Sequence, residues 1–366
     1  MMKAPLSRRQ LLVATGAAGL TASFQAAASN PRPVVGLSLP GTGVQATVAR
    51  ELFAGYEAAL KATAELIVVD DESKADKTAE AYESFGRDSR IVAATGIVGT
   101  PHAKKALPAA VEAGLPVVGI RSGADDLRDG NPWVWHLRAS YGDELRKVIE
   151  VASVYTSIGI LYSDDDFGRG ALVQARKFAE VNKLKIAAAL PCDRNGADVK
   201  QQASQLIKLP GVSCVLLCLI QRPAMEAAMA MRDARYMMPI YGMSFIATAQ
   251  LARSESPLLD GIALVSPFPL ARVATMALAR SFRQAMIDAK TPELIVSPTT
   301  FEGYFYGSVL NEALAKGGAR RRKDLQSYLA INRPLEVKEV QVRFDELRVG
   351  YRYLALLRKE GQTLRT

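Results

Sequence analysis

The chain has 366 residues and a formal net charge of +9, with only two histidines and three cysteines. With so few histidines, a zinc site and a His-based catalytic relay are not expected, and no metal or cofactor is predicted. Basic residues are scattered apart from the run at 320–323, which we interpret as the polar face of a helix start. No aromatic residues are interleaved with that run, so no nucleic-acid partner is expected.

The first 28 residues have the features of an export signal. The sequence SRRQLL at residues 7–12 is a twin-arginine pattern, and the mildly apolar run at 11–28 ends in AAA, an A-x-A cleavage signature. The run is too weakly hydrophobic to span a membrane, and no cysteine for a lipid anchor lies near the cleavage point. We expect a soluble periplasmic protein of net charge +6, exported by the twin-arginine route in preference to the general route.

From residue 33 onward, short apolar runs alternate with amphipathic segments. Strands are predicted at residues 34–39, 66–69, 91–94, 115–120, 133–137, 158–162, 185–190, 212–220, 239–242, 262–265, 337–342 and 351–357. Helices are predicted at residues 48–62, 74–85, 100–113, 143–154, 171–181, 198–209, 224–234, 275–288, 301–315 and 321–330. This alternation predicts an α/β chain with parallel sheets that are covered on both faces.

The alternation is too long for one sheet, and two similar halves meet near residues 137–142. We therefore predict two doubly wound lobes. No low-complexity linker separates the halves, so the lobes are expected to face each other across a crevice.

The segment 91–123 forms one strand–turn–helix–strand unit, and both strand ends are followed by small and hydroxyl residues. Ligands of open parallel sheets bind beyond the carboxyl ends of the strands, so both turns would face the crevice. Thr100 could offer its hydroxyl and the helix N-terminal amides to a carboxylate. Equally, Thr100 could be only an N-cap, with Pro101 as the first helical residue.

The turn after the first strand formally contains a dinucleotide fingerprint. Gly41, Gly43 and Ala46 give G-x-G-x-x-A, and Asp70 could bind a ribose. Pro40 interrupts the junction, however, and the acid lies farther along than usual, so a plain βα turn is the favoured interpretation.

The run at 164–166 consists of three aspartates, which lack the alternation of a calcium-binding loop. We favour a turn in which one aspartate caps the next helix, with Phe167 as an apolar wall of the crevice. Cys214 and Cys218 lie about 13 Å apart along one strand, too far for a disulfide. Cys192 could pair only if the fold brought it close to one of them, and free buried thiols are favoured.

No nucleophile elbow, P-loop, H-E-x-x-H or C-x-x-C motif is present. The absence of a catalytic constellation points to binding without chemistry.

Six stretches, in this order, resemble periplasmic solute-binding proteins of ABC transporters, of the leucine/isoleucine/valine-binding type. They are PGTG, GIVGTPHAKKALPAAVEAGLPVVGIRSGADDLR, WVWHLRASYGDE, GILYSDDDFGRGAL, MPIYGMSF and FEGYFYGSVLNEAL. The resemblance covers most of the mature chain and implies two lobes joined by three crossovers that close on a small ligand. It implies an N-terminal lobe of residues 31–138 plus about 270–333, and a C-terminal lobe of about 139–269 plus 334–366.

The resemblance also implies where a ligand carboxylate would bind. It falls near Gly99 and Thr100, with help from Ser122 and the neighbouring Gly123. Phe167 stands where an aromatic residue of the other lobe, usually tyrosine, covers the ligand.

Two residues depart from the family pattern. Ser244 stands where amino-acid binders have an acid that receives the ligand ammonium, so the ligand could lack that group. Arg121 is not typical of its position and could either bind a ligand carboxylate or point to the lobe surface. Gln221 and Tyr304 are weaker candidates for lining the cleft.

The sequence therefore predicts the binding component of an ABC importer. It would be a monomer without catalytic activity that captures a small carboxylate-bearing solute, such as an amino acid, amide or organic acid. It would present this solute to a permease in the inner membrane. A ligand-binding sensor of the same fold stays open as an alternative, as does an exported NAD(P)-dependent oxidoreductase that uses Gly41, Gly43 and Asp70.

Overall fold

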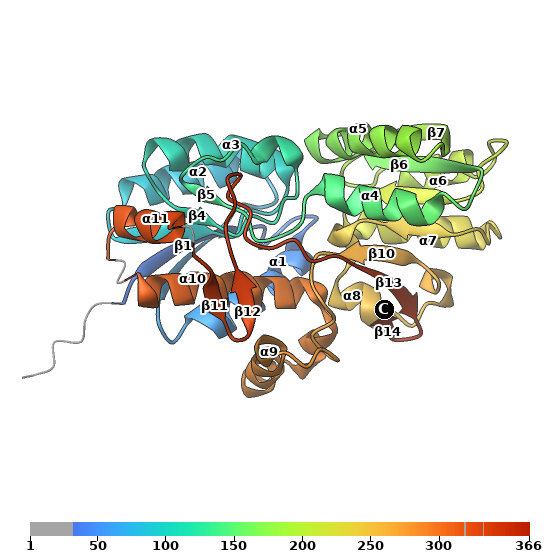
Figure 1. Cartoon of the computed structure of the whole chain (residues 1–366). Helices are drawn as coiled ribbons and strands as arrows, with labels where there is room; N and C mark the ends of the chain where they lie inside the picture. Colours follow the sequence, from blue (N-terminus) through green and yellow to red (C-terminus); the bar gives the residue numbers. More distant parts are fainter. Residues whose placement is uncertain (1–31, 318–319, 332) are drawn as a thin grey trace, which may run out of the picture. The chain divides into compact units, whose positions relative to one another are not determined.

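The computed structural model describes residues 32–317, 320–331 and 333–366, so the predicted signal peptide at 1–28 lies outside the described residues. The first sheet has the strand order β2-β1-β3-β4-β5, and all of its neighbouring strands run parallel. Figure 1 labels strands β1, β4 and β5 of this sheet. Its strands are β1 (Val34–Leu39), β2 (Glu65–Asp70), β3 (Ile91–Thr95), β4 (Val117–Val118) and β5 (Val134–Trp135).

The second sheet has the order β14-β13-β10-β9-β8-β6-β7. Its strands are β6 (Ser157–Ser163), β7 (Lys185–Cys192), β8 (Val215–Cys218), β9 (Ile240–Gly242), β10 (Ala263–Ser266), β13 (Ala355–Glu360) and β14 (Thr363–Arg365). Strands β6 to β10 run parallel, whereas β13 and β14 add an antiparallel edge. A separate hairpin consists of β11 (Leu335–Val337) and β12 (Val340–Val342). The predicted α/β class with two parallel sheets is confirmed.

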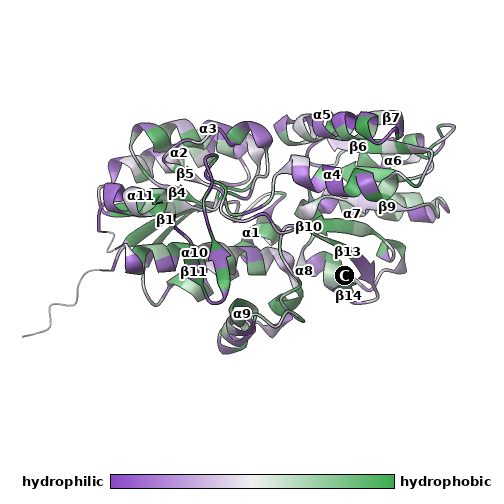
Figure 2. Cartoon of the chain, in the orientation of Figure 1, coloured by the Kyte–Doolittle hydropathy of each residue, from purple (hydrophilic) through white to green (hydrophobic). Residues whose placement is uncertain are grey.

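Helices cover both faces of each sheet. They are α1 (Ala46–Leu60), α2 (Ala75–Arg87), α3 (Thr100–Glu112), α4 (Tyr141–Ala152), α5 (Asp166–Val181), α6 (Val199–Leu206), α7 (Gln221–Asp233), α8 (Ala249–Arg253), α9 (Ala277–Asp288), α10 (Pro298–Lys316) and α11 (Arg322–Ala330). Short 3₁₀ turns are η1 (Asp125–Leu127), η2 (Ser244–Ile246), η3 (Pro257–Leu259) and η4 (Pro292–Val296). Strands are largely hydrophobic, whereas outer helix faces carry polar residues (Figure 2).

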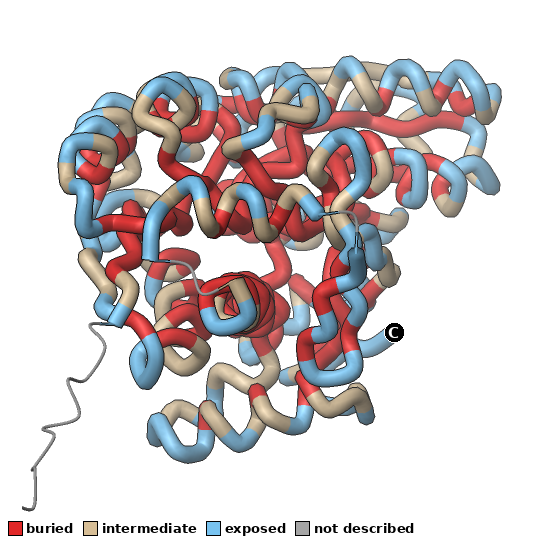
Figure 3. Tube along the Cα trace, turned by 60° about the vertical axis from the view of Figure 1, so that its left-hand side comes forward, coloured by how far each residue is buried: buried red, intermediate tan, exposed pale blue. Residues whose placement is uncertain are grey.

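Strand β1 shows why the strands are continuous apolar runs in the sequence: all six of its residues are buried, because both faces of the sheet are covered. Val35 and Leu37 pack with residues of α1 and α10, whereas Val34 packs with α2 and α3 on the opposite face. In the second sheet, α4 and α5 cover one face and α6 and α7 the other. Burial follows the strands and the inner helix faces throughout (Figure 3).

The chain passes between the two sheets three times, as expected. It leaves the first sheet between β5 and α4 and returns between β10 and α9. The hairpin β11–β12 packs beside α10, and the third passage runs from β12 to β13. Within the described residues, no helix is long and apolar enough to cross a bilayer.

Several details differ from the sequence-based expectations. The strand predicted at 351–357 lies at Ala355–Glu360, and helix α8 was not predicted. The strand predicted at 115–120 is regular only at Val117–Val118, because Gly119 has a φ of +78° that interrupts the extended backbone. The strand predicted at 337–342 is a hairpin, in which Lys338 and Glu339 form the turn with positive φ values. Strand β14 was not predicted.

Candidate functional site

The turns after β3 and β4 lie side by side, as the unit at 91–123 predicts. Gly99, with a φ of +105°, donates its N–H to the Arg121 carbonyl at 3.1 Å. The hydroxyls of Thr100 and Ser122 are 2.9 Å apart and buried. Gly99 is the N-cap of α3 and Thr100 its first residue, so the alternative in which Thr100 caps the helix is wrong. The structure therefore places two hydroxyls and an uncapped helix start at one point.

An aromatic cluster of Tyr141, Phe167 and Phe245 lies next to these turns. The ring of Phe167 is 5.1 Å from each of the other two rings, and all three residues are buried. Gly123 makes room for this cluster, because a Cβ atom at that position would lie 2.6 Å from the Tyr141 ring. Phe167 was expected as an apolar wall, whereas its two aromatic partners were not anticipated.

Arg121 is 1% exposed, which excludes the alternative that it points to the lobe surface. Its Nε donates to Glu302 and its Nη2 to Thr299, both at 3.0 Å, and its guanidinium carbon lies 4.5 Å from the centroid of the Phe245 ring. Its Nη1 is buried and has no hydrogen-bond partner. Arg121 thus carries one spare charged donor beside the aromatic cluster.

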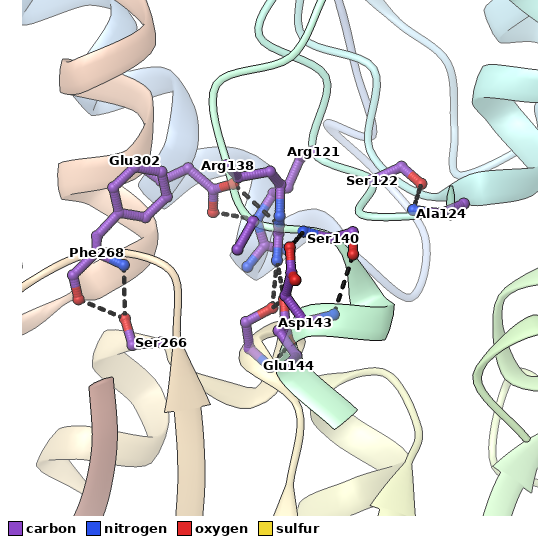
Figure 4. A network of polar contacts seen from close by, with 12 residues as sticks. Arg121, Ser122, Ala124, Arg138, Ser140, Asp143, Glu144, Ser266, Phe268 and Glu302 are labelled. Carbon is purple, nitrogen blue, oxygen red and sulfur yellow. Dashed lines mark hydrogen bonds and ion pairs between the residues drawn. The ribbon is translucent and has the colours of Figure 1, made fainter. Parts of the chain in front are cut away.

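Arg138, in the first passage between the sheets, connects helices of both sheets (Figure 4). It donates Nη1 to Glu302 of α10 at 3.1 Å and Nη2 to Glu144 of α4 at 2.6 Å. Burial disfavours the charged guanidinium, but the charges of Glu302 and Glu144 outweigh it and raise the pKa of Arg138. Arg138 therefore stays charged and joins the two halves of the described chain.

Ser244, at the carboxyl end of β9, belongs to the same network. Its hydroxyl donates to Glu144 at 2.8 Å and accepts from Arg138, and its backbone N–H donates to the other Glu144 oxygen at 3.0 Å. The position predicted to receive a ligand ammonium is thus occupied by a serine whose polar groups are engaged inside the protein.

Arg194, in the turn after β7, reaches the first sheet's site from the opposite side. Its Nη1 pairs with Asp165, whose carboxylate also caps α5 by accepting the Gly168 N–H at 3.0 Å. Its Nη2 is buried without a partner and lies 3.4 Å from where a Cβ atom of Gly99 would be. This residue was not among the sequence candidates.

Two predicted residues lie apart from these contacts. Gln221, the first residue of α7, donates its side-chain amide to Gln250 at 2.7 Å. Tyr304 packs on the Phe282 ring and accepts a hydrogen bond from Lys338 at 3.1 Å. The other seven candidates are Gly99, Thr100, Arg121, Ser122, Gly123, Phe167 and Ser244. Hydrogen bonds and ring contacts link them through Tyr141, Phe245 and Arg138.

A pocket of about 340 Å³ opens beside the aromatic cluster. It is lined by Lys104, Ala124, Asp125, Asp126, Tyr141, Asp166, Phe167, Arg169, Gly170, Val173 and Gln174. Lys104 of α3 pairs with Asp126 at 2.8 Å and with Asp166 of α5 at 3.6 Å, so ion pairs from both sheets' helices border this opening.

The dinucleotide-like turn is engaged internally. The Asp70 carboxylate accepts the Thr42 N–H at 3.1 Å and its hydroxyl at 2.9 Å, which makes it the anchor of a plain βα turn. Burial raises the Asp70 pKa, but these bonds, together with those from the backbone N–H groups of Glu72 and Gly41, outweigh burial and hold the pKa below its usual value. Among the described residues, no cluster of three or more His, Cys, Asp or Glu side chains could hold a metal ion.

The missed residues carry a weak sequence signal. Glu302 is a single acid among aromatic residues in FEGYFYGS, and Arg138 is a single base in an apolar stretch. A charge in an otherwise buried segment indicates a partner elsewhere, but nothing in the sequence says that Glu144 and Glu302, 158 positions apart, share one arginine.

Comparison with known proteins adds a family and a fold. The sequence model of a family described as periplasmic binding protein matches residues 34–330. A substrate-binding periplasmic protein from Ralstonia solanacearum is 27% identical, with a TM-score of 0.81 over 89% of this chain and 97% of that one. No match was found among curated proteins.

Two more distant structures share the fold. A possible leucine/isoleucine/valine-binding protein from Rhodopirellula baltica is 22% identical, with a TM-score of 0.84 over 92% of this chain and 96% of that one. An ABC transporter solute-binding protein from R. palustris, in complex with benzoate, is 17% identical, with a TM-score of 0.80 over 91% and 95% of the two chains.

Proposed function

The chain belongs to the periplasmic binding protein family, a family of solute-binding proteins and not of enzymes, and from this premise we propose its specific task. It is the binding component of an ABC importer that captures a small carboxylate-bearing solute between its two sheets. It then presents the solute to a permease of the inner membrane, and it acts as a periplasmic monomer.

One observation carries the proposal: buried donors follow the strand ends of one sheet, and aromatic rings from the other half lie against them. Thr100, Ser122 and Arg121 supply hydroxyls and a charged N–H, while Phe167 and Phe245 supply apolar cover. Few convergent polar groups in an apolar setting are typical of small-molecule sites. The start of α3 adds backbone N–H groups and a favourable dipole for a carboxylate.

Ligand binding between the two halves explains how a permease would distinguish the ligand-bound protein from the free one. A ligand that contacts both halves stabilises the arrangement in which they are close, and a permease can recognise that arrangement. The lobes in this proposal comprise residues 31–138 with about 270–333, and about 139–269 with 334–366.

The test is a thermal-shift and calorimetric screen of residues 29–366 against carboxylates, amides and amino acids. A ligand at 100 times its dissociation constant adds about 2.7 kcal/mol to the free energy of unfolding, which raises the melting temperature by a few degrees. Small-angle scattering should then show a more compact particle with that ligand.

Variants connect the result to the site. Thr100→Val and Ser122→Ala should weaken binding about tenfold, because each removes a hydroxyl at the carboxylate position. Thr156→Val is the matched control, since Thr156 is exposed at the amino end of β6. Unchanged affinity in both site variants would contradict this placement of the carboxylate. A ligand-bound protein that activates a signalling partner and no permease would favour the sensor alternative.

A further inference from the structure

The carboxylates and the arginines around the site differ in whether their buried atoms have hydrogen-bond partners. Among the described residues, no buried carboxylate oxygen lacks a hydrogen-bond partner, whereas several arginines have a buried nitrogen without one. A buried polar group without a partner is unusual in a folded protein, and near a binding site it marks a place that a ligand can fill. The carboxylates and the arginines together therefore indicate whether the site suits an anionic or a cationic group of the ligand.

Both carboxylates of the central network are fully engaged. Glu302 accepts from Arg138 at 3.1 Å and Tyr306 at 2.7 Å through Oε1, and from Arg121 at 3.0 Å through Oε2. Glu144 accepts from Arg138 and the Ser244 hydroxyl through Oε1, and from the Ser244 N–H through Oε2. Every oxygen of these two glutamates already accepts at least one hydrogen bond.

Two further carboxylates at the contact between the halves, those of Glu51 and Asp165, are also engaged. Both oxygens of Glu51 accept the Ala249 N–H, and the Ser297 hydroxyl donates to one of them. Asp165 accepts from Gly168 and pairs with Arg194. A ligand ammonium would therefore find none of these four carboxylates unpaired.

The spare groups are charged donors. Arg121, which is 1% exposed, has a free Nη1 next to the Phe245 ring. Arg194 has a free Nη2 beside Gly99, and Arg138 has a free Nε. Guanidinium N–H groups suit carboxylates and repel an ammonium group.

We propose that the ligand is an organic acid with an apolar body and without a free amino group. Its carboxylate takes the spare N–H of Arg121, and its body packs against Tyr141, Phe167 and Phe245. This inference rests on the proposed function and narrows its ligand. Arg138 is the residue that sets the preference, because it occupies the Glu144 and Glu302 oxygens that would otherwise receive an ammonium group.

An α-amino acid carries the same carboxylate but adds an ammonium group that would lose water without gaining a charged acceptor. Burial of an unpaired charge is costly, so each amino acid should bind more weakly than the acid of the same carbon skeleton that lacks the amino group. The comparison of such pairs isolates the ammonium group from size and shape.

The experiment is isothermal titration calorimetry at pH 7 on residues 29–366, unfolded and refolded to remove any copurified ligand. The probes are 4-methylpentanoate with leucine, 3-methylbutanoate with valine, 3-phenylpropanoate with phenylalanine, and phenylacetate with phenylglycine. We expect at least one acid to bind, and to bind at least tenfold more tightly than its amino counterpart.

The outcomes separate the two proposals. Equal or tighter binding of the amino acids would overturn the inference and leave the proposed function in place. Failure of every probe in both series to bind would contradict the small-carboxylate function and the inference together.

A variant tests the role given to Arg138. Arg138→Met frees oxygens of Glu144 and Glu302, so the acid-to-amino-acid affinity ratio should fall by at least fivefold. A general loss of packing would weaken both members of a pair and leave the ratio unchanged, which would overturn the role of Arg138. If that variant does not fold, Arg138→Lys serves, because a single ammonium group cannot reproduce the two separate N–H groups with which the planar guanidinium reaches Glu144 and Glu302.

Discussion

Glu51 of α1 and Ala249 of α8 join the two halves of the described chain: both oxygens of the buried carboxylate accept the Ala249 N–H, at 3.1 and 2.9 Å. The residues are 198 positions apart, and the Ser297 hydroxyl donates to the same carboxylate. Burial raises the pKa of Glu51, although the hydrogen bonds oppose that shift.

Replacement of this acid should therefore destabilise the protein. Glu51→Ala leaves the Ala249 N–H and the Ser297 hydroxyl buried without an acceptor, so the free energy of unfolding should fall by about 1–3 kcal/mol. Urea unfolding of the two proteins measures the difference. Glu83→Ala is the control, because Glu83 is exposed in an i,i+4 pair with Arg87, and its loss should change stability by less than about 0.5 kcal/mol. Equal effects of the two substitutions would contradict the role given to Glu51.

Stability should decrease as the pH falls below about 6.5, because both histidines are buried. Burial, with the charge of Arg194, lowers the pKa of His102 to about 4, and burial with the charge of Arg128 lowers that of His136 to about 3. The unfolded chain therefore binds more protons than the folded one between pH 6.5 and these values. Each histidine should make stability fall by about 1.4 kcal/mol per pH unit within that window.

The measurement is the free energy of unfolding at several pH values between 7 and 4.5, for the wild type and for His136→Gln. Glu51 acts in the opposite sense, since a raised carboxyl pKa costs stability above its unfolded value, so the difference between the two slopes is the informative quantity. Identical slopes would contradict the titration assigned to His136, which also faces Asp345 and Arg352.

Two helical glycines should respond in opposite directions to alanine. A Cβ atom at Gly55 of α1 would lie 2.2 Å from the Thr300 carbonyl of α10, so Gly55→Ala must push these helices apart. Its free energy of unfolding should fall by at least about 2 kcal/mol, as is common when a packed core is overfilled. Gly170 of α5 has nothing within 4 Å of that position, and Gly170→Ala should add about 0.5–1 kcal/mol through helix propensity. Thermal unfolding of both variants tests the pair, and a stable Gly55→Ala protein would show that α1 and α10 are not in such close contact.

The three cysteines should be unreactive in the folded protein. All three are free and buried, and burial raises the thiol pKa of Cys192 and Cys214 to about 12 and that of Cys218 further. Thiolates are the reactive species, so a thiol reagent at pH 8 should label none of them before unfolding and all of them in guanidinium chloride. Mass spectrometry of the labelled protein reads out both states. A disulfide or a fast-labelled thiol in the folded protein would be the contrary result.

The sequence predicts well those features that depend on local pattern. The apolar run at 34–39 coincides with β1, and the alternation of strands and helices defines both sheets, because burial on two faces requires continuous apolar strands. The sharp turn at the hairpin β11–β12 was missed, since Lys338 and Glu339 adopt positive φ without a glycine to announce it.

The site shows the same division. Thr100 and Ser122 were expected together because two adjacent parallel strands end next to each other. The link from Arg121 to Glu302 spans 181 positions and follows no motif, so only the three-dimensional arrangement reveals it. Arg194 was missed for a similar reason. It belongs to the opposite half, and nothing in the sequence around it indicates that its side chain lies beside Gly99.

The order of strands has a consequence for how the molecule is made. Strand β13 pairs with β10, which precedes it by about ninety residues, while α9 to α11 lie between them in the sequence. Until residues 355–360 have left the ribosome, the edge of β10 that faces away from β9 has its backbone groups unpaired. The second sheet therefore cannot be completed until β13 has been synthesised. A nascent chain stalled before residue 355 should therefore be cut by proteases more readily than a chain that includes β13.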